Sequence, residues 1–360
     1  MLNHETKDKK ARRIKCVVWD LDDTLWDGVL SEDLSVTLKQ NVLEIIKTLD
    51  SRGILHSIAS KNDERLATSC LKELGTWNYF VAPQINWNAK SESIRRIGVL
   101  LNIALDSIAF VDDQQFEQSE VSANLPEVLC ISASLMDSLL SMPEMNPPAT
   151  SEESRQRRGM YQTEIARKTA QEEFQGPTEE FLASLHMTLS IAPAQLCDLT
   201  RAEELTLRTN QLNTTGQIYD LQQLAQFSVS KSHFLYIIGL EDRFGDYGKI
   251  GLTLVERTLD KWCIKLLLMS CRVISSGIGT VVVRYLINQA HRSGVRLVAE
   301  FLPTDRNRIM YMTYRLMGFK ELENRGQLLT LEVDVKQVQA YPEYVKIRAT
   351  NITAISREEG

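Results

Sequence analysis

The sequence has little that would favour a membrane protein, a disulfide scaffold or a thiol-based metal cluster. Its 360 residues include only six cysteines, which are scattered, with no pair separated by two residues. We therefore expect free thiols in a reducing compartment. No apolar run approaches the roughly 20 residues that cross a bilayer, and no apolar stretch follows the charges at the start. We expect no membrane span and no signal peptide, and hence a cytoplasmic protein.

Basic charge is also not in excess. The chain has 41 Lys and Arg against 47 Asp and Glu, a net charge of −6, which disfavours nucleic acid as the main ligand. Hydrophobic residues make up 43% and charged residues 24%, as in ordinary globular proteins. At roughly 100–200 residues per domain, a chain of this length suggests two domains.

Residues 1–141 alternate short apolar runs with amphipathic stretches. Apolar runs at 14–19, 54–59 and 107–111 predict strands, because each is short and uninterrupted. The intervening stretches have helical spacing and end at glycine or a turn. This β-α-β-α-β order predicts an α/β fold with a doubly wound parallel sheet. The predicted helices are 41–50, 64–74 and 90–101.

The rest of the chain divides into three further segments. Residues 142–186 begin with a proline-rich, charged stretch and predict a linker and helical connector. Residues 187–335 predict a second α/β domain, and 336–360 a polar, partly ordered tail. In the second domain the expected strands are 234–238, 250–256, 262–269, 296–301 and 328–333, and the expected helices 199–208, 279–292 and 306–317.

Acidic residues follow two of the predicted strands of the first domain at the points where these strands end. Asp20 and Asp22 follow the first strand, and Asp112 and Asp113 follow the third. The carboxyl ends of parallel strands meet at one edge of a sheet, where open α/β folds bind ligands. Several carboxylates at one edge repel each other unless a cation is present. Hard oxygen ligands suit Mg²⁺, which also binds substrate phosphate, and we therefore expect a Mg²⁺ site here.

Polar residues complete this pattern. Ser60 follows the second strand, and Lys90 lies between the second and third strands. A lysine at this position can neutralise a phosphoryl group or a carboxylate nucleophile. One pair of aspartates could form a simple turn or cap, but a turn does not explain the whole ordered set.

That ordered set resembles the haloacid dehalogenase (HAD) superfamily. The resemblance implies that Asp20 is the nucleophile that accepts a phosphoryl group, and that Asp22 is the general acid and base. It also implies that Mg²⁺ is held by Asp20, the Asp22 carbonyl, Asp112 and Asp113. The phosphate-binding residues that it implies are Thr24, which orients the loop, and Ser60, Lys61, Asn62 and Lys90.

The spacing of these motifs leaves no room for a lid domain. Members of the superfamily insert lids after the first strand or between the serine and the lysine. Here the segments 22–60 and 60–90 hold little more than one helix and one strand each. We therefore expect a capless, HAD-like Rossmannoid domain, with water excluded by the second half of the chain.

Beyond this set of site residues, six stretches spread over roughly residues 12–335 resemble the FkbH-like proteins, which are HAD-type enzymes of polyketide pathways. The resemblance implies a Mg²⁺-dependent phosphatase and glyceryl transferase. Such an enzyme takes D-1,3-bisphosphoglycerate, removes phosphate, and passes a glyceryl unit through an enzyme thioester to the phosphopantetheine thiol of an acyl carrier protein. The product feeds methoxymalonyl-type or tetronate-type biosynthesis. The matching stretches are 15–26, 58–63, 85–87, 208–213, 242–248 and 270–273.

The second domain has its own candidate site at a strand-loop-helix junction. Cys271 and Arg272 follow a predicted strand, and Gly277 and Gly279 precede a helix. An arginine neighbour and a helix N-terminus both favour a thiolate, so Cys271 is our candidate acyl acceptor. A buried structural role remains the alternative, with Cys16 and Cys263 as other candidate thiols. The motifs near 300–319 resemble a GNAT-like acetyltransferase fold, which implies a loop that binds the carrier's phosphopantetheine arm.

Several questions stay open from the sequence. Asn210, Gln211, Arg243 and Asp246 are candidates to bind the substrate hydroxyls, although the stretch around Gly245 could equally be a hairpin turn. The transferred group could be glyceryl or lactyl. Two other functions are a plain Mg²⁺-dependent phosphatase whose second domain is a lid, and a carrier-binding scaffold without turnover.

Overall fold

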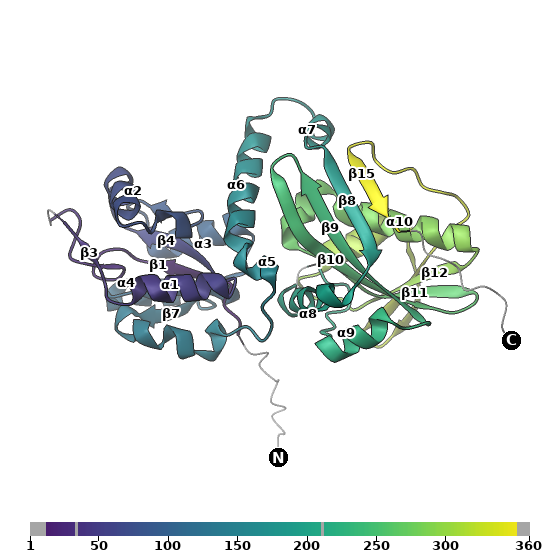
Figure 1. Ribbon diagram of the computed structural model, residues 1–360, viewed down its shortest axis with the longest axis horizontal. Coiled ribbons are helices and arrows are strands. Elements are labelled where there is room, and N and C mark those ends of the chain that lie inside the picture. Colours follow the sequence, from purple (N-terminus) through teal and green to yellow (C-terminus); the bar gives the residue numbers. More distant parts are fainter. Residues whose placement is uncertain (1–11, 33–34, 210–211, 351–360) are drawn as a thin grey trace, which may run out of the picture. The chain divides into compact units, whose positions relative to one another are not determined.

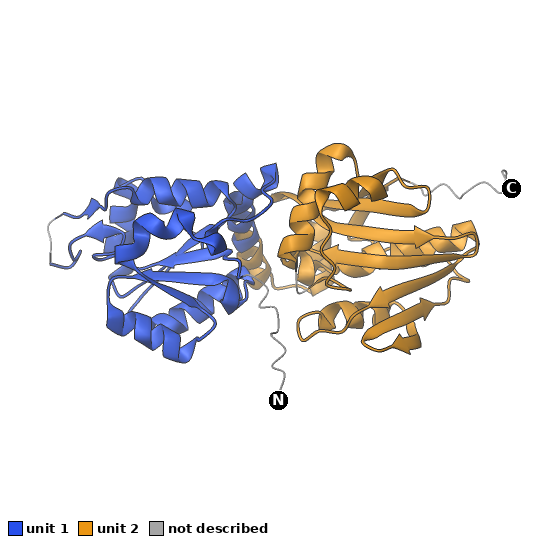
Figure 2. Cartoon of the chain, turned by 90° about the horizontal axis from the view of Figure 1, so that it is seen from below, with its two compact units in different colours: residues 1–165 blue, residues 166–360 orange. Residues whose placement is uncertain are grey.

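The computed structural model describes residues 12–32, 35–209 and 212–350 (Figure 1). The chain forms two compact units, residues 1–165 and 166–360 (Figure 2). Helices α5 (Glu152–Arg155), α6 (Arg157–Glu173) and α7 (Thr178–Ser184) lead from the first unit into the second. None of the helices in the described part of the chain is both long enough and apolar enough to span a bilayer.

The first unit is built on a five-stranded parallel sheet in the order β5-β4-β1-β6-β7. Alternate residues of β1 point to opposite faces. Val17 and Trp19 pack with α1 and α2, whereas Cys16 and Val18 pack with α3 and α4. Helices therefore cover both faces, and the predicted doubly wound α/β fold is confirmed. The strands are β1 (Cys16–Trp19), β4 (Leu55–Ser60), β5 (Gln84–Ile85), β6 (Ile108–Asp112) and β7 (Leu129–Ser132), and the helices α1 (Val42–Ser51), α2 (Glu64–Glu73), α3 (Lys90–Leu101) and α4 (Gln115–Asn124).

A small two-stranded sheet follows the first acidic motif. It consists of β2 (Trp26–Asp27) and β3 (Thr37–Leu38), which pair antiparallel. Trp26 is fully buried in the core shared with α1 and α2. This packing fixes the loop that carries Asp22 against the body of the unit.

The second unit is built on an eight-stranded mixed sheet in the order β13-β14-β12-β11-β10-β9-β8-β15. Helices α10 and α11 pack on one face, and α8 and α9 on the other. The unit is α/β, as predicted. The strands are β8 (Met187–Pro193), β9 (His233–Asp242), β10 (Gly245–Arg257), β11 (Lys261–Met269), β12 (Arg296–Phe301), β13 (Lys320–Arg325), β14 (Leu328–Val333) and β15 (Val345–Ala349), and the helices α8 (Leu199–Arg208), α9 (Leu221–Ser228), α10 (Ile278–Ser293) and α11 (Arg308–Leu316).

Strand β15 lies in the segment whose sequence predicted only a polar tail. It pairs in parallel with β8, from Val345 opposite Met187 to Ala349 opposite Ile191. Val345 is buried in the main core of the unit. The end of the described chain is therefore part of the sheet.

Candidate active site

The sheet of the first unit places a ligand-binding crevice beside β1. The chain runs from β1 outward to β4 and β5, and then returns to the other side of β1 for β6 and β7. Open α/β folds bind ligands at such a reversal of strand order, outside the carboxyl ends of the strands. Asp20 directly follows β1, and Asp112 is the last residue of β6. Both residues therefore lie at this reversal.

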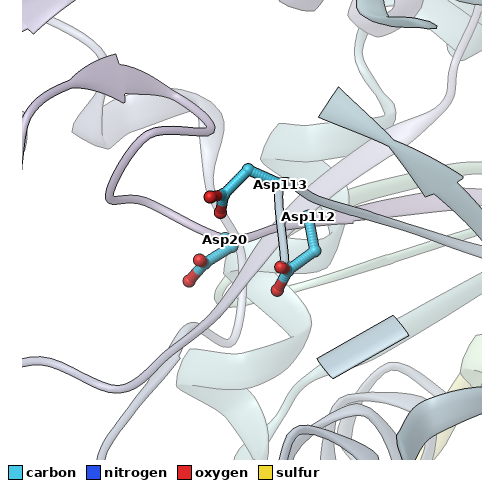
Figure 3. Close-up of side chains that lie close together, drawn as sticks. All are labelled: Asp20, Asp112 and Asp113. Carbon is cyan, nitrogen blue, oxygen red and sulfur yellow. The ribbon is translucent and has the colours of Figure 1, made fainter. Parts of the chain in front are cut away.

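Three of the predicted carboxylates come together there (Figure 3). Asp20, Asp112 and Asp113 each offer an oxygen within 4.8 Å of the others. Asp20 and Asp112 are buried, and Asp113 is exposed. The Asp113 carboxylate is oriented by Thr24, whose hydroxyl donates to Asp113 Oδ1 at 3.2 Å and accepts from the Asp113 backbone N–H at 3.0 Å.

Lys90 supplies the buried positive charge of the site. It is the first residue of α3, and its ammonium group donates to Asp20 Oδ1 and, at 2.9 Å, to the Ala59 carbonyl. Its Nζ also lies 3.4 Å from Asp112 Oδ2. Burial raises the pKa of Asp20 above the ordinary carboxyl value, and Lys90 and a hydrogen bond from Ser60 partly offset this rise.

Asp112 is the carboxylate whose surroundings most clearly favour a cation. Its Oδ1 accepts the Gln114 N–H at 2.7 Å, whereas its buried Oδ2 has no hydrogen-bond partner among the described residues. Burial, followed by the charge of Asp20, raises its pKa to about 6. A buried carboxylate oxygen without a hydrogen bond, beside two further carboxylates, suits a hard divalent cation such as Mg²⁺. The residues present thus fit the predicted metal.

The Asp22 carboxylate points to a different set of partners. It accepts hydrogen bonds from the Trp26 indole at 2.9 Å, the Leu30 N–H at 3.0 Å and the Asn62 amide at 2.8 Å. These three donors fix its orientation. Through one of these bonds, Asn62, a predicted phosphate-binding residue, directly contacts Asp22, the predicted general acid and base.

Helix α4 contributes contacts that the sequence analysis did not identify. Glu117 is buried and pairs with the Lys61 ammonium at 2.6 Å. This pair joins the loop that follows β4 to helix α4, which follows β6; β4 and β6 lie on either side of β1. One turn further along, the Glu120 carboxylate accepts from the Ser91 N–H at 3.1 Å and the Ser91 hydroxyl at 2.5 Å. The only sequence signal for these contacts is two glutamates three residues apart, shortly after Asp113.

In the second unit, Cys271 is partly exposed and lies two residues after the end of β11, at the start of a short 3₁₀ helix (Cys271–Ser276). The Arg272 guanidinium donates to the Tyr247 carbonyl at 2.9 Å. Gly277 has a φ of 68° and precedes α10, and Gly279 lies in its first turn. The other candidate thiols are buried. Burial raises the pKa of Cys263 to about 11 and that of Cys16 further still.

Arg243 and Asp246 lie at an exposed hairpin between β9 and β10. Asp242 pairs with Gly245 across this turn, and Asp246 accepts the Gly248 N–H at 2.7 Å. The Arg243 guanidinium lies over the ring of Phe244. The stretch around Gly245 is therefore a hairpin turn, which was one of the two alternatives left open by the sequence. Asn210 and Gln211 lie outside the described residues.

The chain itself fills the space where β11 and β12 separate. Their pairing ends with Ile264 opposite Ala299. Beyond that point, the buried Thr214 donates its N–H to the Leu267 carbonyl at 3.1 Å and accepts the Leu302 N–H at 2.9 Å.

Comparisons with known proteins give partial structural likenesses. No family model matches this sequence, and no curated protein matches it. Among solved structures, the N-terminal part of a Bacteroides fragilis protein, containing a phosphatase domain and complexed with Mg, is 29% identical with a TM-score of 0.31. The match covers 34% of this chain and 36% of that one, so it spans about a third of each.

Several N-acetyltransferase structures are also similar to part of the chain. The ribosomal-protein-S18-alanine N-acetyltransferase from Escherichia coli is 14% identical, covers 42% of this chain and 96% of its own, and has a TM-score of 0.33. An N-acetyltransferase from Thermoplasma acidophilum, in complex with coenzyme A, is 15% identical and has a TM-score of 0.32. The match covers 40% of this chain and 98% of that one. The chain thus resembles both phosphatase-domain and acetyltransferase structures.

Proposed function

We propose that this chain is a Mg²⁺-dependent phosphatase and glyceryl transferase of the FkbH-like type. In this proposal it removes phosphate from D-1,3-bisphosphoglycerate and loads the glyceryl unit onto an acyl carrier protein. The observation that carries the phosphatase part is the buried Asp20–Lys90–Asp112 group at the reversal of strand order. Two buried carboxylates on one ammonium suit phosphoryl transfer better than a purely structural role, because the arrangement leaves Asp112 Oδ2 without a hydrogen bond.

Each residue of the first site has a role in the phosphoryl transfer. The Asp20 carboxylate attacks the phosphorus of the C3 phosphate ester, and the bond from phosphorus to the C3 oxygen breaks, which leaves the C1 acyl phosphate for the second site. Lys90 holds Asp20 in place and neutralises charge on it. Asp22 protonates the leaving oxygen and later takes a proton from the water that hydrolyses the aspartyl phosphate. Bound Mg²⁺, held by Asp20, Asp112 and Asp113, supplies positive charge to the carboxylates and phosphoryl oxygens.

The acyl transfer belongs to Cys271. Its thiolate attacks the carbonyl carbon of the acyl phosphate, so that a C–S bond forms while the C–O bond to phosphate breaks. The carrier thiol then attacks the thioester and regenerates the Cys271 thiol. Among the three candidate thiols, Cys271 is the one that is partly exposed, which supports this assignment.

Intact-protein mass spectrometry with D-1,3-bisphosphoglycerate tests the proposal. Without carrier, the protein gains one acyl group, which peptide mapping places on Cys271; holo-carrier then removes it. The adduct mass also distinguishes a glyceryl from a phosphoglyceryl group, and so reports whether the C3 phosphate has been removed. Cys271→Ala gains no adduct, whereas the matched control Cys197→Ala, at another cysteine with an accessible side chain, behaves like wild type. Release of free glycerate with no adduct at any time would favour the plain phosphatase instead.

A further inference from the structure

Helix α11 (Arg308–Leu316) exposes a continuous apolar stripe. Ile309, Met312 and Leu316 are 49%, 47% and 75% exposed, whereas Met310, Thr313 and Tyr314 on the other side of the helix are buried. At about 100° per residue, the three exposed side chains fall within an arc of about 60°. They therefore form one surface and are not scattered exposed residues of the ordinary kind.

The same face carries positive charge. Arg308 and Arg315 are exposed, and they extend the arc to about 120° on the side next to Met312. The helix, RIMYMTYRL, contains no acidic residue, although the whole chain has a net charge of −6. A partner that matches this face needs an apolar stripe of its own, flanked by acidic rather than basic side chains.

The buried side of α11 is fixed to the rest of the unit by hydrogen bonds and aromatic packing. The buried Asn307 side chain, just before α11, donates to the carbonyls of Asn213 and Leu302 at 3.0 and 2.9 Å. Tyr314 is fully buried and packs with Phe301 and Phe319. A face on a rigid element loses little conformational freedom when a partner binds, which favours docking.

The buried side of α11 packs against the helix that follows the candidate thiol. Thr313 of α11 approaches Gly279 in the first turn of α10, with its methyl carbon 3.9 Å from the position of an added Cβ. Helix α10 directly follows the 3₁₀ helix that begins at Cys271. A protein docked on α11 would therefore be bound to a helix that packs directly against α10, the helix that follows Cys271 in the chain.

We propose that α11 is the docking face for the acyl carrier protein, which binds through an acidic helix bearing an apolar stripe. This inference rests on the proposed function, because that function requires a protein partner to present a thiol at Cys271. The apolar stripe provides the buried area, and Arg308 and Arg315 provide orientation and charge complementarity.

Binding of a holo acyl carrier protein to the full chain tests this inference. The double variants Met312→Glu/Leu316→Glu and Arg308→Glu/Arg315→Glu should each weaken binding at least about tenfold, the loss of about 1.4 kcal/mol of binding free energy. The effect of the arginine variant should shrink as salt is raised, because exposed charges are screened. Leu259→Glu, at a 77% exposed leucine outside α11, is the matched control and should bind as wild type does.

Two further measurements separate the possible failures. Acylation of Cys271 in the absence of carrier should be unchanged in all variants, which verifies that the second unit is folded. Wild-type carrier affinity in both α11 variants would overturn the assignment of this face and leave the proposed function intact. If wild type forms dimers that Met312→Glu/Leu316→Glu dissociates, with carrier affinity unchanged, the face belongs to a second copy of the chain. If wild type binds no holo-carrier but releases phosphate, both the docking proposal and the carrier step are wrong.

Discussion

Asp112 is buried beside the carboxylate of Asp20, and Lys90 is the ammonium group within ion-pair distance of both. The folded protein therefore holds a proton on Asp112 up to pH about 6, whereas an unfolded chain releases it near pH 4. Stability from this group is present below pH 4 and is lost as the pH rises through about 6. At neutral pH the metal-free site is thus destabilising, as functional sites often are.

We expect Asp112→Asn to stabilise the metal-free protein at pH 8 by about 2 kcal/mol while abolishing phosphate release, because the amide carries no charge. Denaturant unfolding in chelator at pH 8 and pH 4.5 measures this gain, which should be smaller at the lower pH. A variant less stable than wild type at pH 8, or a gain independent of pH, would argue against a strained carboxylate here.

The sequence was sufficient to predict Asp20 and Asp112 as neighbours, because each lies at the carboxyl end of a strand in one parallel sheet, whereas Lys90 was joined to them by the resemblance to the HAD superfamily. It was not sufficient for Glu117 or Trp26. Their contacts with Lys61 and Asp22 depend on how α4 and the β2–β3 sheet pack, and no local pattern specifies that packing.

At the scale of elements, α4 contacts three segments of the site: the loop after β4, the end of β6 and the start of α3. Glu117 holds Lys61, the Gln118 amide donates to the Asp112 carbonyl at 2.9 Å, and Glu120 holds Ser91 at the start of α3. Lys90 precedes Ser91, so the position of its ammonium group depends on this last contact. The packing of α4 therefore determines how the side chains of the site are oriented toward one another.

Glu120→Ala should lower kcat for phosphate release about tenfold, with a stability loss of about 1–2 kcal/mol, because two donors of Ser91 lose their acceptor. Steady-state kinetics and denaturant unfolding measure the two effects. The control is Ser119→Ala on the same helix, where the hydroxyl bonds the Gln115 carbonyl in an exposed setting. Equal kinetics for both variants would show that Lys90 is positioned without α4.

The elements that could not be predicted share a physical cause. Strand β5 (Gln84–Ile85) is too short to show a period, and β13 (KELENR) is exposed throughout and almost wholly polar. Strand β15 alternates buried and exposed residues over only five positions, within a polar segment. These strands form because they pair with neighbouring strands. The neighbour of β15 is β8, which is far away in the sequence.

At the scale of the whole molecule, the carboxylate site lies within the first unit and the candidate thiol within the second. Each unit has its own buried core. A substitution that destabilises only the second unit should therefore abolish acyl loading without abolishing release of the C3 phosphate at the first site.

Val345→Asp places a charge in the core of the second unit and should destabilise that unit by about 3 kcal/mol, with loss of carrier loading. Release of the C3 phosphate should stay within about twofold of wild type. Calorimetry and a phosphate assay measure both, with Lys346→Asp, at the exposed neighbour in β15, as the control. If phosphate release falls in parallel with carrier loading, the two activities are not separable.

The most direct test of the central claim is release of the C3 phosphate of D-1,3-bisphosphoglycerate by Asp20→Asn in the presence of Mg²⁺. The substitution removes the nucleophilic charge with almost no change in shape, so circular dichroism and unfolding should show an intact fold. We predict that the rate falls at least about 1,000-fold, as expected when a covalent nucleophile is lost. Residual activity within about tenfold of wild type would contradict the assignment of Asp20 and, with it, the proposed chemistry of the first unit.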